Sequence, residues 1–399
     1  MILNNDSPEQ AAYESALEIH LTHGERWGYE THVLRQNIIG TPETNGMDAK
    51  GEWKGGVFKK PLYLSSLVIN ELAKPEDERA EWILTVVLPQ KPGATIHYSF
   101  AQGNRKDDRP VLVVFLNGLA TDQSSWLPVM AGIMHQRKTT EAGFPSLLAY
   151  DRFGQGLTTD RDPLDAEIGK EPGHGHNVAD AAVDLRNVIV EVWGKEFPEP
   201  GVILVANSIG GAIARLYAQQ HDTAAILFLD SVIANSDFNL WPNPDAPGFD
   251  QKAELPNDVS IEMLREQRAR LAKIFGLSVV NREGLSRKDL PRLLPLAEGP
   301  VLGEEGKRPW ITVVGHDFET FADESQKMMG ASRSLSMRYS NPIWHQYNLG
   351  LTKLTDENFS RGPIQAKGCG HFIQKDDPDF VIEETLDLVD KVRLKWSFI

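Results

Sequence analysis

Cysteine is nearly absent from the chain, because Cys369 is the only one among 399 residues. A single cysteine excludes an intramolecular disulfide and a cysteine-based metal cluster. Such a composition is typical of a protein in a reducing compartment. Stability must therefore come from a hydrophobic core. The hydrophobic content of 41% is sufficient for one large domain with an appendage, or for two domains.

Long apolar runs and targeting signals are also lacking. No stretch approaches the roughly 18 apolar residues that a transmembrane helix requires. The N-terminus has no basic region followed by an apolar segment, as a secretory signal would have. The C-terminal residues Ser397-Phe398-Ile399 lack the basic middle residue of a peroxisomal Ser-Lys-Leu address. These absences predict a soluble cytoplasmic protein.

Positive charge and nucleotide-binding motifs are scarce as well. Lys and Arg number 41 against 56 Asp and Glu, which gives a formal net charge of −15. Nucleic acid and anionic membranes would repel such a chain, so neither is an expected partner. The chain contains neither Gly-x-Gly-x-x-Gly nor a P-loop, which argues against a nucleotide cofactor. His174 and His176 stand close together, but no further ligand cluster accompanies them, and we expect a solvated loop there rather than a metal site.

The character of the sequence changes near residue 83. Residues 1–82 predict a helical appendage, with helices over 7–27 and after Pro61. From residue 83 to 399, short apolar runs alternate with segments of helical spacing, which predicts an α/β domain with a mostly parallel, doubly wound sheet. The expected strands lie at 82–88, 94–100, 111–116, 146–150, 202–206, 225–229, 310–314 and near 362–366.

The segment between Asp230 and Trp310 is longer than a simple crossover needs. Within it, Ser260 is a predicted helix cap, and the apolar residues from Ile261 to Phe275 have helical period. We interpret residues 236–305 as a helical lid over the carboxyl edge of the sheet, where open α/β sheets place their sites. Such a lid would exclude water and shape the pocket.

The segment Val202–Ala214 carries the strongest signal for chemistry. A buried-strand pattern runs into the sequence Asn-Ser-Ile-Gly-Gly at 207–211 and then into a helix. Strand, tight turn and helix with a serine on the turn is the pattern of a nucleophile elbow, whose strained backbone needs small flanking residues. Ala206 and Gly210 supply them, with Ala206 in place of the more usual glycine. Ser208 is therefore the candidate nucleophile.

A serine hydroxyl needs a general base, and His371 is the candidate among the 11 histidines. His371 follows the expected last strand within a glycine-rich turn and precedes the closing helix over 378–396. A base at this point would face the elbow.

Four motifs, taken in order, resemble the α/β-hydrolase fold family over residues 83–399. They are Asn-Gly at 117–118, Asp-Arg-Phe-Gly-Gln-Gly at 151–156, Ala-Asn-Ser-Ile-Gly-Gly at 206–211 and Gly-His-Phe at 370–372. The resemblance implies a triad in the chain order Ser, Asp, His. It implies two places for the acid, one at Asp230 after the strand that follows the elbow helix, and one near Asp317 after the strand that follows the lid. We favour Asp230, because Asp317 is one residue short of the usual place.

The same resemblance implies an oxyanion hole formed by two backbone N–H groups. Ile209 follows the nucleophile and supplies one, and Leu119 follows the Asn-Gly turn and supplies the other. The family's more usual His-Gly is Asn-Gly here, and the retained glycine leaves the backbone donor intact. Asp151 and Arg152 are expected to anchor the neighbouring loop rather than to react.

Within this fold, the Asn-Gly turn, the segment 150–156 and an acid at the earlier strand are similar to fungal hydrolases of the mycophenolic-acid acyl-CoA hydrolase type. The similarity implies a small apolar ester, thioester or lactone as substrate, cleaved through an acyl-enzyme in secondary metabolism. The triad needs no metal or cofactor. Several members carry a peroxisomal address, which this C-terminus lacks.

Residues from about 20 to 84 resemble the start of a fungal galactosyl- or mannosyltransferase. The similarity rests on segments 23–29, 58–65 and 81–83. In that family an Asp-x-Asp that holds the metal and the sugar nucleotide follows directly, whereas the residues from Ile83 to Pro89 contain no acidic pair. We interpret 1–82 as a non-catalytic fragment. The alternatives to a serine hydrolase are a sugar-nucleotide-dependent glycosyltransferase and a non-catalytic protein with the hydrolase fold.

Overall fold

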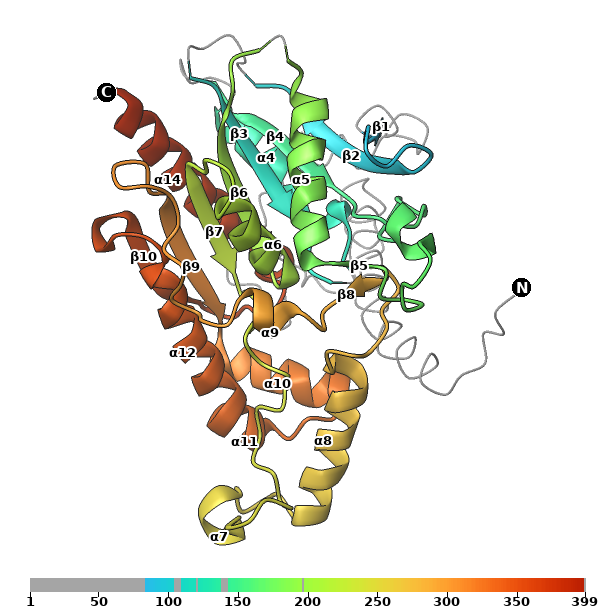
Figure 1. Cartoon of the computed structure of the whole chain (residues 1–399). Helices are drawn as coiled ribbons and strands as arrows, with labels where there is room; N and C mark the ends of the chain where they lie inside the picture. Colours follow the sequence, from blue (N-terminus) through green and yellow to red (C-terminus); the bar gives the residue numbers. More distant parts are fainter. Residues whose placement is uncertain (1–82, 104–108, 120, 138–142, 196, 398–399) are drawn as a thin grey trace, which may run out of the picture. The chain divides into compact units, whose positions relative to one another are not determined.

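A computed structural model describes residues 83–397, apart from 104–108, 120, 138–142 and 196. The expected appendage over 1–82, with its two helices, lies outside the described residues. The central element is an eight-stranded sheet with the order β1-β2-β4-β3-β6-β7-β9-β10 (Figure 1). The strands are β1 (Ile83–Val87), β2 (Thr95–Ala101), β3 (Val111–Leu116), β4 (Ser146–Tyr150), β6 (Gly201–Asn207), β7 (Ala225–Leu229), β9 (Trp310–His316) and β10 (Ser360–Ala366).

The sheet is parallel from β4 through β10, and only β2 is antiparallel to its neighbours β1 and β4. The register is continuous across the centre, where Val114 of β3 lies between Leu148 of β4 and Leu204 of β6. Parallel strands place all their carboxyl ends at one edge, so the residues that follow β3, β6, β7 and β9 converge there. This arrangement confirms the predicted fold class.

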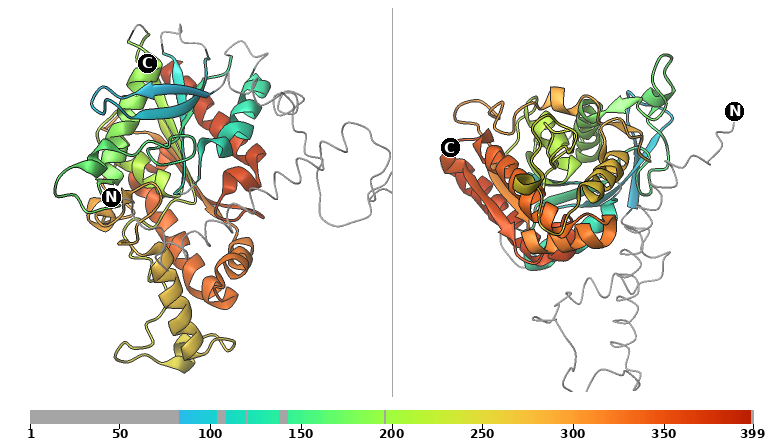
Figure 2. Two further views of the ribbon diagram at one scale, coloured as in Figure 1. Left: turned by 90° about the vertical axis from the view of Figure 1, so that its right-hand side faces the viewer. Right: turned by 90° about the horizontal axis from the view of Figure 1, so that it is seen from below.

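Strand β3 shows that the centre of the sheet is covered on both faces, because all six of its residues are buried. Alternate residues of β3 join two different hydrophobic clusters, as the period of two in a strand requires. One cluster contains residues of α5 (Val178–Trp193) and α6 (Ile209–Ala218), and the other contains residues of α4 (Leu127–Arg137) and α14 (Pro378–Ser397). The left view of Figure 2 places α5 on the opposite side of the sheet from α4 and α14.

The chain between β7 and β9 leaves the sheet at its carboxyl edge. It forms α7 (Gln251–Glu254), α8 (Ile261–Phe275), β8 (Leu285–Ser286) and α9 (Leu290–Leu293), and β8 pairs with β5 (His176–Asn177). The side chain of Ser260 accepts a hydrogen bond of 3.2 Å from the backbone N–H of Met263 and so caps α8. Figure 1 shows α7 and α8 beyond the ends of β7 and β9.

The remaining helices also lie near this edge. After β9 come α10 (Phe318–Met329), α11 (Arg333–Leu335), a π-helical turn at 336–340 and α12 (Asn341–Leu351), and after β10 comes α13 (Ile373–Asp376). Short 3₁₀ turns span 123–126, 163–166, 352–354 and 357–359. Among the helices of the described residues, none is both long enough and apolar enough to cross a membrane.

Candidate active site

Ser208 occupies a strained turn between β6 and α6. Its backbone angles are φ 54° and ψ −121°, a region that residues other than glycine rarely adopt. Two hydrogen bonds to the strand after the elbow helix hold the turn. The N–H of Ser208 donates to the carbonyl of Leu229 at 3.2 Å, and the N–H of Val232 donates to the carbonyl of Ser208 at 3.0 Å. Such strain costs on the order of 1–3 kcal/mol and persists only where the surroundings enforce it.

Glycines at 210 and 211 let α6 lie directly against the sheet. A Cβ on Gly210 would approach the carbonyl oxygen of Leu116 to 2.6 Å, and a Cβ on Gly211 would approach Oγ of Ser231 to 2.3 Å. Neither contact is tolerable, so only glycine fits. This close packing explains the small residues around Ser208 in the sequence.

Asp230 and His371 are joined by a short hydrogen bond. Asp230 is the first residue after β7, is fully buried, and has Oδ2 2.6 Å from Nδ1 of His371. Because a carboxylate only accepts hydrogen bonds, Nδ1 of His371 carries the hydrogen and Nε2 is left with its lone pair. The loop between β10 and α13 supplies His371. The side-chain amide of Asn207 donates to the carbonyl of His371 at 2.9 Å, which ties this loop to the elbow.

The carboxyl group of Asp230 is held in its ionised form. Burial alone would raise its pKa, but the positive charge and hydrogen bond of His316, together with the hydrogen bond of His371, outweigh burial and lower the pKa to about 2. Asp230 therefore stays charged at any pH at which the protein would work.

Asp317, the alternative acid, is engaged elsewhere. Its side chain caps α10, where Oδ1 accepts hydrogen bonds from the backbone N–H groups of Glu319 at 3.0 Å and Thr320 at 3.1 Å. Oδ2 accepts a further bond from Gly368 at 3.3 Å. The structure thus brings Asp230 to His371 and uses Asp317 to begin a helix.

A second histidine, His316, also contacts Asp230. Its Nδ1 lies 2.8 Å from Oδ1 of Asp230, and its Nε2 lies 3.2 Å from Oδ1 of Asn341. Neither His316 nor Asn341 belongs to one of the sequence motifs described above. The available signal for His316 was its position just after the expected strand at 310–314, at the edge where parallel sheets place their sites. Asn341 begins a helix beyond a π-helical turn, and no local pattern marks it.

The turn Asn117-Gly118-Leu119 is held from one side by buried side chains. Arg152 donates to the carbonyl of Asn117 at 2.8 Å and to that of Gly118 at 3.0 Å, and Gln155 also donates to the carbonyl of Gly118 at 3.0 Å. In a trans peptide the N–H points opposite to the C=O, so the N–H of Leu119 points away from these side chains.

Gly118 brings this turn against the elbow. A Cβ on Gly118 would lie 2.9 Å from Oδ1 of Asn207 and 3.2 Å from Cβ of Ser208. The predicted donor Leu119 thus follows a residue in direct contact with Ser208, and the other predicted donor, Ile209, is the first residue of α6.

The segment between β7 and β9 contributes one residue to this arrangement. Glu283 is buried and forms an ion pair of 2.9 Å with Arg152, and its second carboxylate oxygen accepts a hydrogen bond of 2.9 Å from Gln155. Asp151 anchors the same loop by accepting the backbone N–H of Gln123 at 2.7 Å. Burial raises the pKa of Asp151 to about 6, against the effect of its hydrogen bonds.

Two further carboxyl groups hold the loop of His371. Asp376 accepts the backbone N–H of Gly370 at 2.8 Å, and Glu324 of α10 accepts the backbone N–H of His371. Burial, followed by the charge of Asp376, raises the pKa of Glu324 to about 7. The loop therefore rests on an acid that titrates near neutral pH.

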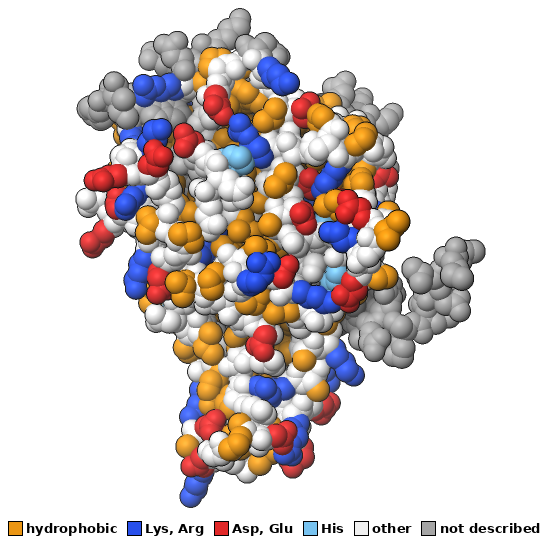
Figure 3. Space-filling view, in the orientation of Figure 1, with side chains coloured by type: hydrophobic (Ala, Val, Ile, Leu, Met, Phe, Trp, Pro, Cys, Tyr) orange, Lys and Arg blue, Asp and Glu red, His pale blue; other side chains and the backbone are white. Residues whose placement is uncertain are grey.

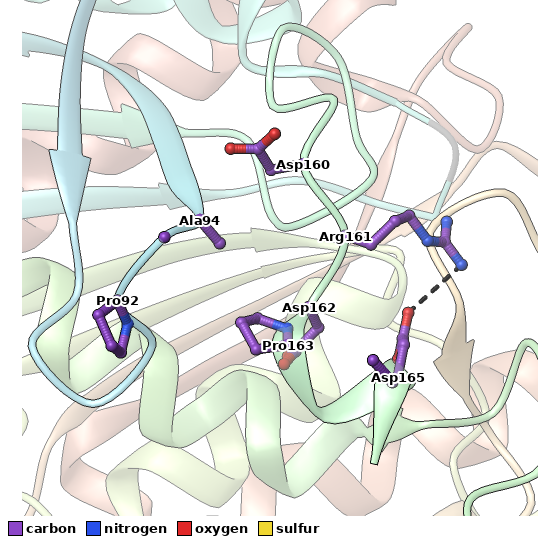
Figure 4. A pocket seen from close by; sticks show the side chains of 9 residues that line it. Pro92, Ala94, Asp160, Arg161, Asp162, Pro163 and Asp165 are labelled. Carbon is purple, nitrogen blue, oxygen red and sulfur yellow. Dashed lines mark ion pairs between the residues drawn. The ribbon is translucent and has the colours of Figure 1, made fainter. Parts of the chain in front are cut away.

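A separate hollow of about 540 Å³ lies between the β1–β2 turn and the loop at 160–166 (Figure 4). Its walls include Pro92, Asp160 and Asp165, and none of Ser208, Asp230 and His371 lines it.

Within the described part of the chain, no group of three or more His, Cys, Asp or Glu side chains is placed to hold a metal ion. On the face seen in Figure 3, acidic and basic side chains are interspersed.

The chain belongs to the alpha/beta hydrolase family, whose match covers residues 113–384 and so includes Ser208, Asp230 and His371. The sequence matches no curated protein significantly. Similar solved structures include the peroxisomal alpha-beta-hydrolase Lpx1 from Saccharomyces cerevisiae, with 14% identity, a TM-score of 0.46, and coverage of 78% of this chain and 88% of that chain.

Two bacterial enzymes are also similar. The enol-lactonase from Burkholderia xenovorans has 14% identity and a TM-score of 0.42, with coverage of 77% of this chain and 100% of that chain. The esterase RhEst1 from a Rhodococcus species has 14% identity and a TM-score of 0.40, with coverage of 78% of this chain and 99% of that chain.

Proposed function

We propose that the protein is a serine hydrolase that cleaves a carboxylic ester, a thioester or a lactone through an acyl-enzyme. The observation that carries the proposal is the 2.6 Å hydrogen bond between Asp230 and His371, on a loop that Asn207 ties to the strained elbow of Ser208. A serine on such a turn, with a histidine whose loop is tied to that turn and whose ring an ionised acid orients, has the parts that an acyl transfer requires.

In the proposed reaction, Oγ of Ser208 attacks the carbonyl carbon and gives its proton to Nε2 of His371. Asp230 keeps the imidazole in the required tautomer and stabilises its protonated form. The tetrahedral intermediate collapses as the bond to the leaving oxygen or sulfur breaks, and His371 returns the proton to that leaving group. A water molecule then attacks the acyl-enzyme with the same base, which releases the acid and regenerates Ser208.

The developing oxyanion would be stabilised by the N–H groups of Ile209 and Leu119. Arg152 and Gln155 hold the carbonyl of Gly118 on the far side, and this orientation supports the role of Leu119 as a donor. A single donor of this kind typically contributes ~100- to 1000-fold in rate.

The surroundings of His371 favour a substrate with an apolar acyl part. The rings of Trp344 and Phe372 lie edge-on to the imidazole, with centroid separations of 5.6 Å and 5.0 Å. The resemblance to fungal acyl-CoA hydrolases makes acyl-CoA thioesters of secondary metabolism the first compounds to try, followed by lactones and simple esters.

Purified wild-type protein and the Ser208→Ala variant test the proposal, with Ser278→Ala at an exposed serine as the matched control. We expect a fluorophosphonate probe to label wild type and Ser278→Ala but not Ser208→Ala. Hydrolysis of p-nitrophenyl esters, acyl-CoAs and lactones should follow the same pattern. A Ser208→Ala protein that cleaves these substrates at the wild-type rate would overturn the serine mechanism, and a folded wild type that no probe labels would indicate a non-catalytic protein.

A further inference from the structure

The two carboxylate oxygens of Asp230 are bound by two different histidines. Oδ2 accepts from Nδ1 of His371 at 2.6 Å, and Oδ1 accepts from Nδ1 of His316 at 2.8 Å. The backbone N–H of His316 adds a third bond to this carboxylate, at 3.3 Å from Oδ1. The proposed mechanism needs only the contact with His371, so the second histidine calls for its own explanation.

Both ring nitrogens of His316 face hydrogen-bond acceptors. Asp230 is an acceptor because it is ionised. The amide of Asn341 is oriented by its own donors, since Nδ2 donates to the carbonyl of Phe318 at 2.9 Å, and Oδ1 therefore faces Nε2 of His316 at 3.2 Å. A neutral imidazole has only one N–H, whereas an imidazolium has two. Both bonds are therefore made only when His316 is protonated.

The surroundings of the His316 ring favour its protonated, positively charged form. His316 is 2% exposed and stacks on Phe321 with a centroid separation of 4.0 Å and an angle of 15°. An aromatic face attracts a cation, and a buried charge needs an opposite charge beside it. The titratable groups whose charge acts on this region are Asp230 from β7, Glu324 from α10 and His371 from the loop after β10. Asp317, next to His316 in sequence, directs its carboxylate to the N-terminus of α10.

We propose that His316 is a positioning residue whose protonated ring stays paired with the Asp230 carboxylate, so that His371 faces a charge-neutral Asp230–His316 pair. The proposal rests on the role of His371 given above. A bare carboxylate stabilises a protonated His371 more strongly than a neutral pair does, because the cation of His316 opposes a second positive charge nearby. The enzyme therefore keeps an unprotonated base, and with it activity, at a lower pH than a lone Asp230 would allow.

Replacing His316 by Asn removes the positive charge of the ring while retaining a hydrogen-bond donor to Asp230. The Asn amide can still donate to Asp230 but cannot be protonated. We expect the acid limb of the kcat/KM profile to move to higher pH by about 1–2 units, the size of a unit charge at short range in a protein interior. Above pH 8, kcat/KM should stay within about 3-fold of wild type. The His345→Asn variant on α12 is the control and should leave the limb in place.

Glu324 needs a separate control because its carboxyl group, with a pKa of about 7, titrates in the pH range of the acid limb. The profiles are therefore compared again in a Glu324→Gln background, where the shift caused by His316→Asn should persist. An acid limb that stays at the wild-type position in both backgrounds would overturn the proposal.

The protonation of His316 is also measured without any catalysis. Wild-type protein is labelled with ¹⁵N-histidine, and the ring signal of His316 is assigned by its loss in His316→Asn. We expect two ring N–H groups on His316, because both ring nitrogens face acceptors. A single N–H at pH 7–8 would contradict the proposal.

The NMR measurement and the fluorophosphonate labelling together distinguish a failure of the serine mechanism from a failure of the role proposed for His316. If Ser208 is not a nucleophile, fluorophosphonate labelling of wild type fails while the doubly protonated His316 is still observed. If His316 is neutral, labelling succeeds and the positioning role is lost.

Discussion

Asn207 donates a hydrogen bond of 2.9 Å to the backbone carbonyl of His371, a residue 164 positions further along the chain. The same amide group donates to the carbonyl of Leu229 at 3.0 Å. Asn207 therefore links the elbow, the strand that leads to Asp230 and the loop of the proposed base. One fully buried side chain therefore contacts the three elements that carry the proposed triad.

Replacing Asn207 by Asp should damage both stability and activity. An ionised carboxylate would repel two carbonyl oxygens, and a protonated one donates only a single bond. We expect a loss of about 1–3 kcal/mol in the free energy of unfolding and a fall in kcat. Asn235→Asp, at an exposed asparagine that also donates to a backbone carbonyl, is the control. Urea unfolding and esterase rates measure both effects, and equal behaviour of the two variants would refute the linking role.

Replacement by asparagine should affect kcat very differently at the two candidate acids, Asp230 and Asp317. Asp230→Asn should lower kcat by roughly 10⁴-fold, because the amide favours the wrong tautomer of His371. Asp317→Asn should leave kcat within about 3-fold, because asparagine is as good an N-cap as aspartate and only the long bond from Gly368 loses its acceptor. Steady-state kinetics on both variants decide the matter, and a large loss in Asp317→Asn alone would reverse the assignment.

Gly118→Ala should push the turn at 117–119, which carries the proposed oxyanion donor Leu119, away from the elbow at Ser208. The new methyl group would lie 2.9 Å from Oδ1 of Asn207 and 3.2 Å from Cβ of Ser208, so the turn must move and carry Leu119 with it. We expect kcat to fall about 100-fold, the value of one displaced donor. Gly93→Ala, where a Cβ meets no atom within 4 Å, carries a backbone cost without this displacement. If Gly118→Ala labelled with fluorophosphonate as fast as wild type, the turn would have no part in catalysis.

Glu324 should make the protein less stable as the pH rises to neutrality. Its pKa is about 7 in the folded protein against an ordinary 4.5, so its contribution to stability is present below about pH 4.5 and is lost as the pH rises through 7. Glu324→Gln cannot ionise and should not show this loss. We expect the difference in free energy of unfolding between pH 5 and pH 8 to be smaller in the variant. Urea titrations at both values test this, and parallel pH curves for the two proteins would contradict it.

The parts of the fold that local patterns determine were predictable. The apolar run over 111–116 predicted a strand that the structure has with the same bounds, because a strand buried on both faces must be apolar throughout. The cap at Ser260 and the periodicity from Ile261 to Phe275 likewise predicted α8. Strand β9 continues two residues beyond the predicted end at 314, because Gly315 and His316 pair with β10 although neither is a typical strand residue.

The parts of the site that depend on chain paths were not predictable. Asp230 and Asp317 both follow sheet strands, and only their positions in space distinguish the acid that meets His371 from the one that begins a helix. The contact between Arg152 and Glu283 joins residues 131 positions apart, and it depends on the route of a segment that has no repeating pattern. No local pattern marks His316 or Asn341, because their contacts join residues that are remote in sequence.

The buried contact of Arg152 with Glu283 limits how the segment between β7 and β9 can move. Removing Glu283 from Arg152 would leave a charge unpaired in the interior, at a cost of about 3–5 kcal/mol. Gly284 follows at once with φ 75°, and β8 is then tied to β5. The segment is therefore anchored at 283–286, and Arg152 links this anchor to the backbone carbonyls of Asn117 and Gly118.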